Sequence, residues 1–171
     1  GLVTTAAGSA WYHSQPVPDD AGLVVDRLGM VVAFAGILGW AGAHRVSERA
    51  GWWTGGFVLW AGTLSVWWWT ESGNLGPYAS LQVFGALLLA MSAWSQRASG
   101  MTGPSWGPVL LAYALAKAFE SADAQVWHWT SHTVSGHTLK HLIAACAVLP
   151  LLAPFRARSA KDAASPKASG G

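Results

Sequence analysis

Five long apolar segments, each close to the length that a lipid bilayer demands, constrain the fold of this chain more than any other feature. A transmembrane helix needs about 20 predominantly apolar residues. The segments that meet this length fully or nearly are residues 23–43, 52–69, 78–94, 106–119 and 134–155. The breaks between them are rich in Gly, Pro and Ser, which interrupt regular structure. The sequence therefore predicts an all-α fold, a polytopic bundle of transmembrane helices.

The composition favours a membrane environment over water. Of the 171 residues, 52% are hydrophobic and only 11% are charged, whereas a soluble domain carries about 25% charged residues. The chain also holds 12 tryptophans, a residue that concentrates where a bilayer meets water. The net charge of +2 is small and the basic residues form no patch, so we expect no binding to nucleic acid.

The two ends of the chain differ in character. Residues 1–12 are mostly small and apolar, with no signal-peptide pattern, and we expect them to be the end of a helix that begins upstream. The prediction is thus five complete spans and a partial one, in a transmembrane domain over residues 1–155. Residues 156–171 are polar, basic and rich in small residues, and predict a disordered tail.

The charges in the loops predict one orientation in the membrane. Seven of the ten basic residues fall in two alternate loops and the tail: Arg45, Arg49, Arg97, Arg156, Arg158, Lys161 and Lys167. The other loops hold acidic residues instead: Asp19, Asp20, Glu71, Glu120 and Asp123. Because cytoplasmic loops carry the excess of Lys and Arg, we expect a cytoplasmic C-terminus and acidic loops on the outer side.

Two histidines are the strongest candidates for function. His137 and His141 are i, i+4 on an apolar helix, so their imidazoles share one face. Two neutral imidazoles so placed suit a divalent metal ion, although the spacing alone is a weak signal and also allows haem or plain packing. For His44 we expect a helix-end role, and for His128 and His132, beside tryptophans, anchoring at the interface.

Three residues in the first part of the chain complete a possible site. Ser9 and His13 are again i, i+4, and Asp26 begins the next span; with the predicted topology all lie at the same outer level as His137 and His141. Asp26 could instead pair with Arg27 or favour the helix start. Three histidines leave the fourth position of a tetrahedral zinc ion open, as in catalytic sites. A carboxylate could then move the proton of a water and a serine could donate to an oxyanion, which are parts of a hydrolase.

Several stretches of the chain resemble the alkaline ceramidase family, especially its bacterial members. They are GSAWYHSQP, VVDRLGMVVAF, GNLGPYASLQVF, YALAKAFESADAQVWHW and SGHTLKHLIAA. This family belongs to a superfamily of seven-helix membrane hydrolases that includes the progestin and adiponectin receptors. The shared pattern, Ser-x3-His, Asp and His-x3-His on the second, third and seventh helices, occurs here as Ser9, His13, Asp26, His137 and His141.

The resemblance covers nearly the whole chain and implies a seven-helix protein of which helix one and most of helix two are missing here. It implies a site made of Zn2+ ligands His13, His137 and His141 and catalytic residues Asp26 and Ser9. The implied reaction is hydrolysis of the amide of an N-acylated sphingoid base, a ceramide-like lipid, to fatty acid and amine, in a bacterial inner membrane with the active site toward its outer face. Its partners would be this lipid amide and membrane lipids, and no feature identifies a protein partner.

Other interpretations stay open. A receptor-like or structural seven-helix protein without hydrolytic activity could keep the same residues, and a bis-histidine haem protein could use the paired histidines. Lys140 stands where we expect an aromatic residue in eukaryotic members of the family. Lys117 and Glu120, which are i, i+3, could pair with each other or line the outer mouth of the site together with Asp123.

Overall fold

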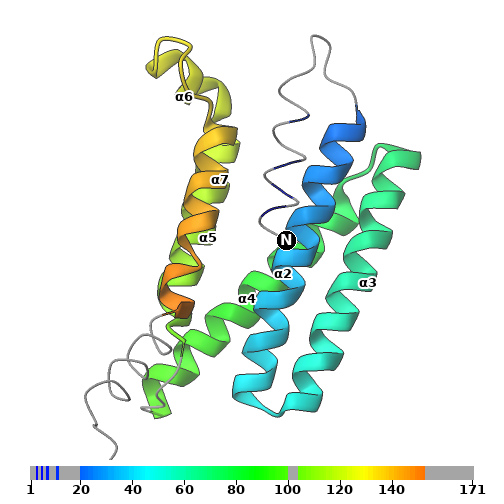
Figure 1. Cartoon of the computed structure of the whole chain (residues 1–171), viewed down its shortest axis with the longest axis vertical. Helices are drawn as coiled ribbons and strands as arrows, with labels where there is room; N and C mark the ends of the chain where they lie inside the picture. The colour runs from blue at the N-terminus through cyan, green and yellow to red at the C-terminus, as the bar shows by residue number, and fades with distance from the viewer. Residues whose placement is uncertain are drawn as a thin grey trace, which may run out of the picture. The chain divides into compact units, whose positions relative to one another are not determined.

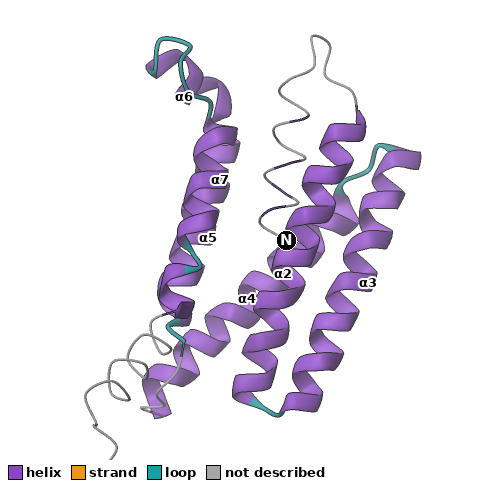
Figure 2. Ribbon diagram, in the orientation of Figure 1, coloured by secondary structure: helices purple, strands orange, loops and turns teal. Residues whose placement is uncertain are grey.

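The computed structural model describes residues 20–99 and 104–152 together with Val3, Thr5, Ala7 and Trp11. Within these residues it contains six α-helices and no strand (Figure 2). They are α2 (Asp20–Arg45), α3 (Glu48–Ser72), α4 (Gly76–Ser99), α5 (Trp106–Ser121), α6 (Asp123–Trp129) and α7 (Gly136–Cys146). The predicted all-α fold is confirmed. The predicted site residues Ser9 and His13, most of the partial helix over residues 1–12 and the tail at 156–171 lie outside the described residues.

The predicted segments correspond closely to the helices. The first four lie within α2, α3, α4 and α5. The fifth is divided, because α7 ends at Cys146 and a turn at Ala147 and Val148 precedes further helical residues up to Leu152. The helical pattern that continues past Glu120 is also present, but Ala122, with φ −97° and ψ 21°, separates α5 from the short α6.

Within the part of the chain that the structure describes, two helices are long and apolar enough to cross a membrane. They are α2, over Ala21–Arg45, and α4, over Gly76–Ser95. Helix α3 has a similar length but is not one of these two helices. The prediction of five complete spans is therefore supported by composition for these two helices, and for the others it stays a prediction.

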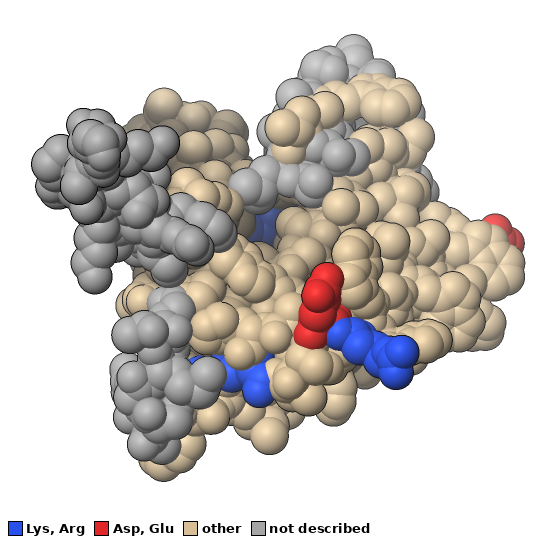
Figure 3. All heavy atoms as spheres, turned by 60° about the horizontal axis from the view of Figure 1, so that its bottom comes forward, with Lys and Arg blue, Asp and Glu red and all other residues tan. Residues whose placement is uncertain are grey.

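Large apolar side chains cover much of the outside of the helices. On α3, Trp52, Trp53 and Trp60 are 77%, 75% and 63% exposed, and on α4 Met91 is 67% exposed. Figure 3 shows a face of the molecule on which uncharged residues far outnumber Lys, Arg, Asp and Glu. Soluble monomers rarely expose large contiguous apolar patches. Such a surface fits apolar surroundings better than water.

The chain divides into two compact units, Gly1–Ser92 and Ala93–Gly171. In the first unit α2 packs along α3 (Figure 1). Small residues allow this approach: a Cβ atom on Gly39 would lie only 3.1 Å from the carbonyl oxygen of Gly51. Close backbone contact at small residues is a common way for membrane helices to associate. The single domain predicted over residues 1–155 is not tested by this division and stays a prediction.

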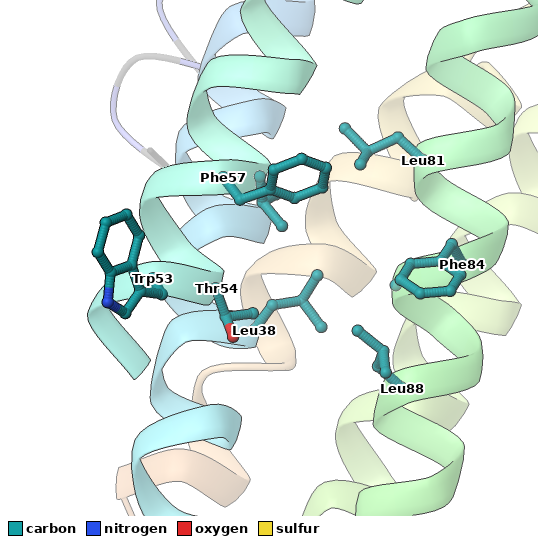
Figure 4. Close-up of a pocket in the computed structure, with 9 residues that line it drawn as sticks. Leu38, Trp53, Thr54, Phe57, Leu81, Phe84 and Leu88 are labelled. Atoms are coloured by element: carbon teal, nitrogen blue, oxygen red, sulfur yellow. The ribbon is translucent and has the colours of Figure 1, made fainter. Parts of the chain in front are cut away.

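The first unit also contains an apolar groove between α2, α3 and α4 (Figure 4). Its volume is about 280 Å³. Its lining includes Leu38, Thr54, Phe57, Leu81, Phe84 and Leu88. At the end of α2, the Arg45 guanidinium donates to the carbonyl oxygen of Ser92 and so links α2 to α4.

In the second unit α7 runs back along α5. The chain reverses after α6, where Ser131 and His132 adopt positive φ angles of 53° and 62°, which are uncommon for residues other than glycine. Hydrogen bonds support this turn: the His132 amide donates to the Trp127 carbonyl at 2.8 Å, and the Val134 amide donates to the Thr130 hydroxyl at 3.1 Å. The turn brings Gly136, the first residue of α7, against the end of α5.

At Gly136 the backbone of α7 lies very close to the end of α5. A Cβ atom there would overlap the carbonyl oxygen of Phe119 and lie 2.8 Å from the Cα of Asp123. Both neighbours are backbone atoms, which cannot move aside as the end of a flexible side chain can. A side chain at position 136 would therefore push α7 away from α5.

We predict that Gly136→Ala destabilises the protein by about 1–3 kcal/mol, the usual cost of overpacking. The matched control is Gly56→Ala in α3, where an added Cβ meets nothing within 4 Å and alanine favours the helix by about 0.5–1 kcal/mol. Thermal unfolding in detergent, followed by circular dichroism, measures both. Equal midpoints for the two variants would contradict the close packing at Gly136.

Candidate metal centre

The start of α7 is held by two side-chain caps. The Ser135 hydroxyl accepts from the Thr138 amide at 3.1 Å. The Asp123 carboxylate, from α6, accepts from the His137 amide at 2.7 Å. The first amides of a helix have no partner within the helix, so such acceptors stabilise it. The backbone that carries His137 is therefore fixed both within α7 and from α6.

His137 and His141 face each other on this helix. Their ring centroids are 4.7 Å apart with an interplanar angle of 72°, and their Nε2 atoms are 3.0 Å apart. Tetrahedral zinc with Zn–N bonds of about 2.0–2.1 Å separates two ligand nitrogens by about 3.3–3.4 Å. The prediction that the two imidazoles share one face is confirmed, and a small adjustment would fit both to one ion.

A partly buried ion-pair network adjoins the imidazole of His137. The Lys117 ammonium contacts one oxygen of Glu120, which confirms the pairing expected from their i, i+3 spacing. The other oxygen lies 3.1 Å from Nζ of Lys140, whose side chain is only 3% exposed. The same Nζ is 3.4 Å from Nδ1 of His137. The sequence did not predict the link between Glu120 and Lys140, although a lysine inside an apolar helix is itself a signal.

Asp26 lies in α2, in the first unit, and is 1% exposed. Its neighbour Arg27 places its guanidinium 3.5 Å from the ring centroid of Trp69 on α3, a cation–π contact. A buried carboxylate is costly unless it is paired, protonated or bound to a metal. Its burial therefore makes Asp26 a candidate functional residue in the first unit, as the facing rings make His137 and His141 candidates in the second.

Among the described residues, His137 and His141 are the candidate metal ligands of the second unit, and Asp26 is a buried carboxylate of the first. Two imidazoles and a carboxylate are ligands that Zn2+ accepts. The remaining predicted site residues, Ser9 and His13, lie outside the part of the chain that the structure describes.

The other histidines of the second unit form an aromatic cluster with a tryptophan. The ring of His132 lies 5.5 Å from that of Trp127 and 5.3 Å from that of His128, both edge-on. Rings of this kind suit the boundary between a bilayer and water. Anchoring at the interface stays the prediction for His128 and His132.

A comparison of the chain with protein-family models, curated proteins and solved structures finds no match.

We predict that Asp123→Ala destabilises the protein by about 0.5–2 kcal/mol, the usual cost of losing a helix cap, because the His137 amide then has no side-chain acceptor from α6. The exposed Ser121→Ala, two residues earlier, is the control. Hydrogen exchange of the first amides of α7 should quicken in Asp123→Ala and stay unchanged in Ser121→Ala. Unchanged exchange in both variants would show that Asp123 does not fix this helix end.

Proposed function

We propose that this protein is a zinc-dependent, membrane-embedded hydrolase that cleaves the amide bond of an N-acylated sphingoid base, a ceramide-like lipid, to a fatty acid and an amine. The observation that carries the proposal is the pair of facing imidazoles on α7, with Nε2 atoms 3.0 Å apart. Paired histidines at i, i+4 on one helix are a known zinc-binding arrangement. The resemblance to the alkaline ceramidase family supplies the reaction and the third ligand, His13.

The proposed roles of the other residues follow from their chemistry. Zinc, when bound, would polarise the amide carbonyl and lower the pKa of a bound water toward neutral pH. Asp26 would take the proton of the attacking water and return it to the nitrogen of the departing amine. The Ser9 hydroxyl would donate to the carbonyl oxygen as negative charge develops there. His137 and His141 would bind the zinc ion and so attach it to α7.

The paired imidazoles fit zinc better than haem. The two axial ligands of a haem iron stand on opposite sides of the porphyrin plane. His137 and His141 come from successive turns of one helix and direct their Nε2 atoms to the same place. They can therefore occupy adjacent positions on a tetrahedral ion but not opposite positions on a haem iron.

The proposed setting is a bacterial inner membrane, with five complete spans in this chain, a cytoplasmic C-terminus and the site toward the outer face. Two observations support a membrane: α2 and α4 are long and apolar enough to cross it, and large apolar side chains are exposed on α3 and α4. A lipid substrate would then reach the site from the bilayer. A receptor-like protein without hydrolysis would share this setting, so catalysis is what separates the two.

We predict about one zinc ion per chain, as expected for a single three-histidine site. Elemental analysis of purified protein should show the zinc lost in His137→Ala, His141→Ala and His13→Ala, because each removes one ligand. His128→Ala, in α6, is the control and should keep its zinc. A wild-type protein without zinc, or undiminished zinc in His137→Ala, would contradict the assignment.

We predict that Asp26→Asn keeps zinc but loses about 10²–10⁴-fold in turnover, the contribution of a general base. Ser9→Ala should lose about 10²–10³-fold, the contribution of one oxyanion donor. Release of fatty acid from an N-acyl sphingoid lipid measures both. Wild-type turnover in Asp26→Asn would exclude the proposed mechanism, and loss of zinc from that variant would make Asp26 a ligand instead. Absence of hydrolysis in zinc-loaded wild type would favour the receptor-like alternative.

A further inference from the structure

Lys140 is a cation buried beside a candidate metal ligand. The residue is 2% exposed, and its Nζ lies 3.4 Å from Nδ1 of His137. The opposite side of that imidazole, Nε2, faces His141. A metal ion bound between the two Nε2 atoms would therefore have a positive charge on the far side of one imidazole ring.

Glu120 provides the compensating negative charge. One of its oxygens is 3.1 Å from Nζ of Lys140, and the other contacts Lys117. Lys117 is 41% exposed, so water screens its interaction with Glu120, whereas Lys140 is almost fully enclosed. Burial of an ammonium group is costly without such a partner. Water therefore screens the contact between Glu120 and Lys140 less than the contact between Glu120 and Lys117.

This arrangement differs from the usual surroundings of a metal-binding histidine. The second nitrogen of such a histidine commonly donates to a carboxylate or a carbonyl, which raises the affinity of the ring for the metal. Here the Lys140 ammonium lies 3.4 Å from Nδ1 of His137, and the Glu120 carboxylate contacts that ammonium. Since like charges repel, Lys140 opposes a bound cation and Glu120 offsets that effect.

We propose that Glu120 and Lys140 together set the zinc affinity of the His137–His141 pair, with Lys140 lowering it and Glu120 acting through Lys140 as a positioning residue. This inference rests on the zinc site of the proposed function. It assigns a role to a contact between α5 and α7 that is distinct from binding the metal directly. The two residues act on the ligand His137 and not on the lipid.

The test is the zinc affinity of the full chain in detergent, measured by competition with a chromophoric chelator. Lys140→Met, of similar length but uncharged, should bind zinc about tenfold more tightly or better, and Glu120→Gln about 10–100-fold more weakly, the range for partners of metal ligands. In the double variant Glu120→Gln/Lys140→Met the affinity should return to that of Lys140→Met. The control Lys117→Met should stay within about threefold of wild type, because its charge is screened.

The visible spectrum of the Co2+-loaded proteins provides a second readout. It should keep the same tetrahedral bands in every variant if the ligands stay in place, which separates a change in affinity from loss of the fold. If Glu120→Gln fails to fold, Lys140→Met and the double variant, both without an ammonium at position 140, still test whether Lys140 lowers the zinc affinity.

Two results would overturn the inference alone: zinc binding in Lys140→Met no tighter than in wild type, or an equal effect of Glu120→Gln with and without Lys140. Absence of zinc binding in the wild type would overturn the proposed function and this inference with it. Tighter binding in Lys140→Met, together with restored affinity in the double variant, would establish the coupling.

Discussion

Close contact between the first turn of α7 and the backbone of α5 determines the geometry of the second unit. Gly136 allows α7 to lie against the carbonyl of Phe119, where a Cβ atom would not fit. At this distance the Asp123 carboxylate reaches the His137 amide, and Glu120 reaches Lys140. The orientation of the paired imidazoles depends on both contacts. A small displacement of α7 would therefore alter the helix cap, the ion pair and the histidines together.

The ionisable residues of this chain stand out because the rest of it is so apolar. An ionisable group inside a membrane protein is costly and is usually retained for function. Asp26 and Lys140 are 1% and 2% exposed, while many tryptophans of α3 are exposed on the outside. Buried ionisable groups together with exposed tryptophans are unusual for a soluble protein. The polar groups of the second unit form a continuous series of contacts from Lys117 to His141.

These contacts also bear on the proposed zinc site. Ligand side chains that already have hydrogen-bond or packing partners can hold their positions before a metal binds. Such a preorganised site needs less rearrangement on binding. Capping by Ser135 and Asp123 fixes the backbone of α7, and Lys140 lies against one imidazole. In the proposed zinc site, metal affinity and helix packing would be linked through the same few residues.

The sequence alone determined the features that depend on local geometry. The lengths of the apolar segments predicted the helices, and the i, i+4 spacing predicted that His137 and His141 share a face, because a helix repeats every 3.6 residues. It could not show that Glu120 pairs with Lys140, twenty positions away, or that Gly136 must be a glycine. Both depend on how the turn after α6 directs α7 back along α5. Only the tertiary structure decided these contacts, because they join residues that no helical periodicity relates.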